Sequence, residues 1–374
     1  SKVRSGRLRM KYWLTVWTVM VSLVGAGRAE EWSIPKAGTL LTFPRDHGSH
    51  PNFKIEWWYI TGHLEGDGRR FGFQATFFRL GQHPGEPEPE GAFRSDQIYM
   101  AHMGVSDPEK GVFLHEEKVN REGWDAFAST QDLDVRNGSW TLQREGSQMR
   151  LVGGVRADAG WELLLEPTKG PVIFGEDGIS KKGPDGTAAS YYITFPRLKA
   201  EGRLSIGGDE FEVTGSAWMD HEISSSQLDR SQTGWNWACL QFDDGREIMG
   251  YVLRTEGEQF SNYSKLVWIS EEGELTHLTL DNYEWIQGGD WTSPVTGATY
   301  PTSPEIKVFD PESGKQRYLQ LRPVMAEQEM TAGAGGVSYW EGACDVYCFD
   351  EKKVVGRAFL EMTGYADDIA EKLR

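Results

Sequence analysis

The chain repeatedly alternates apolar and polar positions with a period of two, which is typical of half-buried β-strands. Gly66-Asp67-Gly68 and Asp243-Asp244-Gly245-Arg246 separate neighbouring runs and predict tight hairpin turns. No stretch keeps a helical period, and only Asp367–Leu373 is expected to add a helical turn. The pattern predicts strands at Lys54–Leu64, Arg70–Leu80, Gln97–Val105, Trp161–Glu166, Ser190–Leu198, Phe211–Met219, Trp235–Phe242, Glu247–Arg254, Lys265–Ile269, Ile306–Phe309, Tyr318–Leu321, Val337–Val346 and Val354–Thr363.

These strands are expected to form an all-β fold of two antiparallel barrels packed against each other. A meander of antiparallel strands must close or stack to protect its edges. At typical strand lengths, roughly eight to ten strands fit on either side of residue 226. We therefore expect one barrel in residues 30–226 and a second in residues 227–374. The segment His83–Glu90 is rich in Pro and Glu and is expected to be a solvated loop.

The first 29 residues have the three parts of a secretory signal peptide. Basic residues precede an apolar run at 12–26, and Gly27-Arg28-Ala29 then supplies small residues for cleavage after Ala29. The run is short for a membrane-spanning helix, although an uncleaved anchor is the alternative. We expect an exported protein with no integral membrane span after cleavage. If the source is a Gram-negative bacterium, the mature chain should be periplasmic.

The composition of the chain limits the kinds of molecule that it is expected to bind. The net charge of −17 makes nucleic acid and anionic membranes poor partners, although an acidic surface also serves solubility alone. The 15 Trp, 13 Tyr and 17 Phe residues can line a pocket for a hydrophobic small molecule. The histidines and cysteines show no H-x-H, HExxH or CxxC spacing, and no nucleotide-binding loop is present. We therefore predict neither a metal nor a cofactor.

The run Trp218-Met219-Asp220-His221-Glu222 is the main candidate for chemistry. Strand alternation places Asp220 and Glu222 on the face of Trp218, and His221 on the other face. A carboxyl group beside Trp in a pocket can have a raised pKa and can protonate an alkene. A second carboxylate or a histidine could then direct water or remove a proton. The alternative is a hydrogen-bonded corner that links the two barrels.

The run Glu56-Trp57-Trp58-Tyr59 carries a further catalytic candidate, Glu56. Glu56 and Trp58 are expected on one face of a strand, and Trp57 and Tyr59 on the other. Glu56 among aromatic residues is either a functional carboxylate or one half of a buried salt bridge, for instance to Arg79 or Arg254.

Several aromatic residues are candidates to bind a substrate, although ordinary packing is the alternative for each of them. Trp235 and Trp237 share a strand face and are expected at a pocket mouth. Glu341, which follows two of these aromatic residues, is a third acid candidate. The substrate-binding candidates are Trp58, Tyr191, Tyr192, Trp218, Trp235, Trp237, Tyr339 and Trp340.

Many short motifs, in the same order, resemble one family across residues 35–366. They are Glu56-Trp57-Trp58-Tyr59, Thr61-Gly62-His63, Phe71-Gly72-Phe73-Gln74, Phe77-Phe78-Arg79, Ala101-His102, Ser190-Tyr191-Tyr192, Trp218-Met219-Asp220-His221-Glu222, Gly234-Trp235-Asn236-Trp237, Met249-Gly250-Tyr251, Tyr339-Trp340-Glu341-Gly342 and Glu361-Met362-Thr363-Gly364-Tyr365. The chain looks like the carotenoid 1,2-hydratase (hydroxyneurosporene synthase) and AttH-like family. The resemblance implies two tandem lipocalin-like barrels, with any site where the barrels meet.

The resemblance also implies a role for one residue. Asp220 stands where the hydratases have their proposed proton-donating acid. The stretch Ser190-Tyr191-Tyr192-Ile193 stands where the carotenoid hydratases are expected to have His and Trp, so this chain departs from their pattern.

The resulting functional expectation is an exported, cofactor-free enzyme of the lyase or isomerase type. It would act on an apolar unsaturated substrate, such as a terpenoid, carotenoid or lipid, by acid–base chemistry between the barrels. A non-catalytic carrier of a hydrophobic ligand is the main alternative, and a purely structural or export-linked protein is another. Hydrolysis is not indicated, because no Gly-x-Ser-x-Gly motif supplies a nucleophile.

Overall fold

A computed structural model describes residues 31–84, 97–123, 125–257, 259–333 and 336–369. Residues Glu31–Arg374 belong to one compact unit. The predicted signal peptide at 1–29 and residues 85–90 of the predicted loop lie outside the described residues. The described part of the chain has no helix that is long and apolar enough to cross a membrane.

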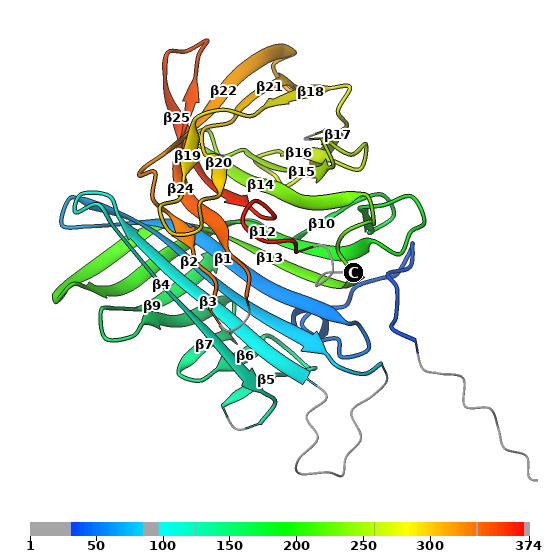
Figure 1. The fold of residues 1–374 in the computed structure, drawn as a ribbon, viewed down its shortest axis with the longest axis vertical. Coiled ribbons are helices and arrows are strands. Elements are labelled where there is room, and N and C mark those ends of the chain that lie inside the picture. Colours follow the sequence, from blue (N-terminus) through cyan, green and yellow to red (C-terminus); the bar gives the residue numbers. More distant parts are fainter. Residues whose placement is uncertain (1–30, 85–96, 124, 258, 334–335, 370–374) are drawn as a thin grey trace, which may run out of the picture. The chain divides into compact units, whose positions relative to one another are not determined.

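The first half of the described chain forms an antiparallel sheet of 13 strands (Figure 1). Its strand order is β4-β3-β2-β1-β13-β12-β9-β8-β7-β6-β5, and β10 and β11 also pair with β12. The strands are β1 (Ile55–Gly66), β2 (Arg69–Gly81), β3 (Gln97–Asp107), β4 (Val112–Arg121), β5 (Ala126–Ala128), β6 (Asp134–Asn137), β7 (Trp140–Glu145), β8 (Gln148–Val155), β9 (Ala159–Pro167), β10 (Val172–Phe174), β11 (Ser180–Lys181), β12 (Ala189–Ile206) and β13 (Asp209–Ser226). A 3-10 turn, η1 (Arg45–His47), precedes them.

The second half forms an antiparallel sheet of 10 described strands in the order β17-β16-β15-β14-β25-β24-β22-β21-β18, with β23 paired to β24. A separate ribbon joins β19 and β20. The strands are β14 (Gln232–Phe242), β15 (Glu247–Thr255), β16 (Lys265–Ile269), β17 (Leu275–Leu278), β18 (Tyr283–Ile286), β19 (Asp290–Thr292), β20 (Thr299–Pro301), β21 (Glu305–Asp310), β22 (Lys315–Pro323), β23 (Glu329–Met330), β24 (Tyr339–Cys348) and β25 (Lys353–Met362).

Both large sheets curl into nearly closed barrels, so the predicted all-β, two-barrel fold is confirmed. In the first barrel the buried amide of Asn137 on β6 links the two ends of the sheet. Its Nδ2 donates to the carbonyl oxygen of Tyr99 on β3 at 3.2 Å and to that of Lys118 on β4 at 3.3 Å. These contacts bring the two ends of the sheet together and so protect strand edges, which are otherwise sites of aggregation.

Every strand predicted from the alternating pattern overlaps an observed strand. Several of the missed strands are short or only partly buried, such as β4, in which no residue is fully buried, whereas β8 alternates clearly and was missed nonetheless. A strand with little buried area shows little apolar alternation, so its pattern resembles a loop. The predicted helical turn is wrong at Asp367–Ile369, which are not helical, and the rest of that segment lies outside the described residues.

Each barrel has its own apolar core, and a third cluster joins the two. Phe73 and Trp161 belong to the first core, and Trp268 and Trp340 to the second. The third cluster combines residues of β12 and β13 with residues of β14, β15 and β25. Burial of apolar area therefore holds the barrels together in addition to filling them.

Gly72 on β2 marks a close approach between the barrels. A Cβ atom at this position would lie 2.6 Å from the Cβ of Ala343 on β24 and 2.6 Å from Ser106 Oγ. Gly72→Ala is therefore expected to cost about 1–3 kcal/mol of unfolding free energy, as overpacking does. Urea unfolding would measure it against Gly170→Ala, since Gly170 has no neighbour within 4 Å. Equal stabilities of the two variants would contradict the close contact.

Candidate functional site

A cavity of about 290 Å³ lies where the two barrels meet. Strands β1, β2, β3, β12 and β13 contribute one wall, and β14, β15, β24 and β25 contribute the other. This volume is near the lower end of the usual range for small-molecule sites. Four carboxyl groups and one amine line the cavity, and so do the aromatic residues Trp57, Tyr59, Phe78, Tyr192, Trp235, Trp237, Tyr251 and Tyr339.

Asp220 is a buried acid in the wall of this cavity. Tyr192 Oη donates to Asp220 Oδ2 at 2.6 Å, Trp218 Nε1 donates to Oδ1 at 2.8 Å, and the Thr194 hydroxyl also donates to Oδ1. Burial raises the pKa of Asp220 to about 7, because it outweighs these donors and acts together with the nearby charge of Glu222. At neutral pH the carboxyl group is thus poised between its acid and base forms.

Glu222, two residues further along β13, faces the same cavity as an ion pair. Its Oε2 accepts hydrogen bonds from Lys182 Nζ and from the Ser190 hydroxyl. The same Lys182 amine donates to Gln227 Oε1. Both charged side chains are buried, so their charges compensate each other beside the cavity.

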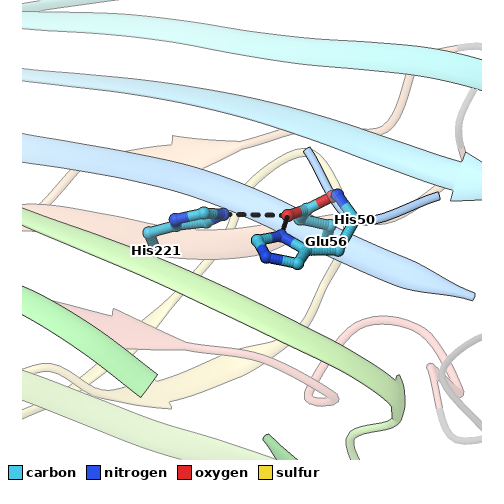
Figure 2. Close-up of side chains that lie close together, drawn as sticks. All are labelled: His50, Glu56 and His221. Atoms are coloured by element: carbon cyan, nitrogen blue, oxygen red, sulfur yellow. Dashed lines mark hydrogen bonds and ion pairs between the residues drawn. The ribbon is translucent and has the colours of Figure 1, made fainter. Parts of the chain in front are cut away.

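His221 lies on the opposite face of β13, as strand alternation predicts, and it belongs to a second buried cluster (Figure 2). His221 Nε2 and His50 Nδ1 each lie 2.9 Å from Glu56 Oε1. Arg79 Nε donates to Glu56 Oε2 at 2.9 Å. Burial opposes ionisation of Glu56, but Arg79 and the two histidines hold its pKa well below the usual range. Trp58 stacks on His221 with ring centroids 4.7 Å apart.

The ligand atoms of His50, Glu56 and His221 lie within 4.8 Å of one another, so these residues could hold a metal ion. The fit is incomplete in two respects. Arg79 already neutralises Glu56. Among the described residues His221 Nδ1 has no hydrogen-bond partner, whereas a metal-bound histidine normally donates from its second nitrogen. The three residues are distant in sequence, so motif spacing could not reveal the cluster. The prediction of no metal stays a prediction.

The predicted site residues fall into three groups. Those that line the cavity are Asp220, Glu222, Glu341, Tyr192, Trp235, Trp237 and Tyr339. Trp218 contacts Asp220 directly. The residues that the structure places away from this cavity are Glu56, His221, Trp58, Tyr191 and Trp340.

Strand alternation explains these last placements. Tyr191 points away from its neighbour Tyr192, and its hydroxyl donates to Thr39 Oγ1 at 2.9 Å. Trp340 points into the core of the second barrel, where its Nε1 donates to the carbonyl oxygen of Ala326 at 2.8 Å. Trp58 packs in the first barrel, next to the Glu56 cluster. Their assignment to a substrate pocket is therefore corrected.

Sequence reasoning did not assign Lys182, Glu361, Trp57, Tyr59 or Tyr251 to the cavity, although the structure places them there. The alternation already separated Trp57 and Tyr59 from Glu56 and Trp58. It did not show which of the two strand faces turns toward the cavity between the barrels. Lys182 lies on a loop and leaves no periodic signal.

The fold and the cavity together define a two-barrel, lipocalin-like protein with an aromatic, acid-containing site between the barrels. The AttH-like family model matches residues 34–365. The chain belongs to the AttH-like family.

Solved structures agree with this assignment. A crystal structure from Nitrosomonas europaea, assigned as an AttH protein, is 33% identical, with a TM-score of 0.80 over 90% of this chain and 100% of that chain. Kievitone hydratase from Nectria haematococca is 15% identical, with a TM-score of 0.65 over 90% of this chain and 96% of that one. The crystal structure of CghA with Sch210972 is 13% identical, with a TM-score of 0.53 over 84% of this chain and 89% of that chain. The last two show a shared fold. No curated protein matches.

Proposed function

We propose that this protein is a cofactor-free enzyme of the hydratase type that adds water to a carbon–carbon double bond of an apolar substrate. The observation that carries the proposal is Asp220, a buried carboxyl group with a pKa near neutrality, set in the aromatic wall of a ligand-sized cavity. The name of kievitone hydratase, which shares the fold, supports the same class of reaction.

In the proposed reaction, the Asp220 carboxyl group gives its proton to one carbon of the double bond. The π electrons form the new C–H bond, leaving a carbocation on the other carbon and a carboxylate on Asp220. Aromatic faces stabilise positive charge, and Tyr59, Trp235 and Trp237 supply such faces here. Water then forms the C–O bond, and the proton it loses returns to a carboxylate of the cavity. The net change is addition of one water molecule.

The protein's own groups prepare Asp220 for this step. The Tyr192 and Trp218 donors stabilise the carboxylate that forms when the proton leaves, and burial makes the acid form accessible at neutral pH. Trp237 Nε1 donates to Tyr192 Oη at 2.9 Å, so a residue of the second barrel orients the phenol that binds Asp220. The proposed site thus needs both barrels.

The test is incubation of residues 30–374 with a terpenoid and lipid extract in ¹⁸O-labelled water. A product heavier by one labelled water molecule, formed only with the enzyme, is the expected result. Ligands that bind and are recovered unchanged would contradict hydration and would favour the carrier function.

We also propose export, on the basis of the signal-like residues 1–29. Sequencing of the secreted or periplasmic protein should find Glu30 at its N-terminus.

A further inference from the structure

Two further acidic residues of the cavity, Glu341 on β24 and Glu361 on β25, lie opposite each other on neighbouring strands. They are register partners in the antiparallel β24–β25 ladder, and both line the cavity. Side chains of directly opposed residues have Cβ atoms about 4.5–5.5 Å apart, and two like charges at such positions repel. Neither glutamate forms an ion pair among the described residues. Two full negative charges would therefore be costly here.

The hydrogen bonds in the described part of the chain engage one oxygen atom of each carboxyl group. The Tyr59 hydroxyl donates to Glu341 Oε1, and Trp235 Nε1 donates to Glu361 Oε1 at 3.2 Å. Glu341 is 1% exposed, and its Oε2 has no hydrogen-bond partner in the described part of the chain. A buried polar atom without a partner in a native fold calls for an explanation, and in the wall of a cavity a bound ligand supplies one.

Protonation resolves the repulsion within the pair. Burial raises the pKa of both carboxyl groups, and the charge of Glu361 raises that of Glu341 further. For Glu361 the pKa is raised to about 8, and the charges of Glu222 and Asp220 contribute. The raised pKa values favour retention of at least one proton by the pair at neutral pH, as in other interacting carboxyl pairs.

We propose that Glu341 and Glu361 together hold one proton and bind a hydroxyl group of the ligand, so that the cavity accepts apolar alcohols or phenols and rejects carboxylates. The protonated carboxyl group offers an O–H donor and the ionised one offers acceptor oxygens, which match a hydroxyl that both donates and accepts. A carboxylate ligand would meet the oxygens of the pair and be repelled. The Lys182 amine, which binds Glu222 and Gln227, offsets this repulsion only in part.

This inference rests on the proposed function only for the location of the ligand. The first test is calorimetric binding of three probes with equal chains, 1-decanol, decanoate and decylamine, to residues 30–374 at pH 7. We expect 1-decanol to bind at least about tenfold more tightly than decanoate. In the variant with both Glu341→Gln and Glu361→Gln, this preference should fall several-fold. Decanoate binding as tight as that of 1-decanol, or decylamine binding tightest of all, would overturn the inference.

A second measurement needs neither ligand nor turnover. The infrared spectrum at pH 7 should contain the carbonyl stretch of a protonated carboxyl group that weakens in Glu341→Gln or Glu361→Gln. The exposed Glu271→Gln variant is the matched control and should leave the band unchanged. Absence of any band that depends on Glu341 or Glu361 would show that the pair holds no proton. Because both readouts are independent of catalysis, a failed hydration assay leaves them interpretable.

Discussion

Asp220→Asn is expected to lower the rate of hydration by about a hundredfold to ten-thousandfold, the usual contribution of a general acid. Asparagine keeps the size of Asp220 and one acceptor oxygen for the Trp218 and Thr194 donors, but its amide nitrogen cannot accept from Tyr192 and it cannot give a proton to an alkene carbon. Ligand binding in the cavity should persist, since the aromatic wall is unchanged. The exposed Asp158→Asn variant is the matched control and should retain the full rate. Loss of binding together with rate would instead point to a structural role for Asp220.

The pH dependence follows from the same group. The reaction requires protonated Asp220, so the wild-type rate should fall as the pH rises above about 7.

The free energy of unfolding should also fall as the pH rises. The folded protein holds this proton more tightly than the unfolded chain, so unfolding free energy is lost as the pH rises from about 4 through about 7. Asp220→Asn removes this loss and should be more stable than wild type at pH 8, by at most about 4 kcal/mol.

Arg79→Ala is expected to cost about 3–5 kcal/mol of unfolding free energy, the largest stability effect that we predict. Arg79 and Glu56 are both fully buried, so the substitution leaves the Glu56 carboxylate without its cation in the interior. Arg79 also donates to the carbonyl oxygens of His50 at 3.0 Å and Phe53 at 2.7 Å. These carbonyl groups would lose their donor as well.

Guanidinium-induced unfolding at pH 7 would measure this cost. The exposed pair of Arg203 and Glu212 provides the comparison, because water and salt screen it. Arg203→Ala should hardly change the midpoint. The double variant Arg79→Leu with Glu56→Leu should recover part of the loss, since no unpaired charge is then buried. If Arg79→Ala were as stable as Arg203→Ala, the Glu56 cluster would not support the fold.

The alternation of residues predicted the strands that bury a full face, because a buried face imposes the period of two. It also placed Asp220 and Glu222 on one face of β13 and His221 on the other. Periodicity does not tell which face turns toward a cavity and which toward a core. For that reason Trp58 and Trp340 were assigned to the pocket, whereas Trp57 and Tyr59 were overlooked.

The alternating pattern also could not predict which distant segments of the chain pair with each other. Glu341 and Glu361 lie opposite each other because of the register between β24 and β25. His50 reaches Glu56 and His221 because η1 and the turn after it bring this part of the chain against β1 and β13. Arg79 was one of two partners considered for Glu56, and the structure selects it over Arg254. Arg254 instead donates to the carbonyl oxygen of Thr363.

The proposed reaction requires Asp220 to be an acid at neutral pH, and the pKa of its carboxyl group can be measured directly. Carbon-detected NMR of the protein with ¹³C-labelled aspartate carboxyl groups, with Asp220→Asn to assign the signal, would follow the titration from pH 4 to pH 9. A midpoint at about 7 is expected. A midpoint at the ordinary aspartate value, near 3.8, would contradict the proposed role of Asp220, because the carboxylate would then be ionised at neutral pH and have no proton to give to an alkene.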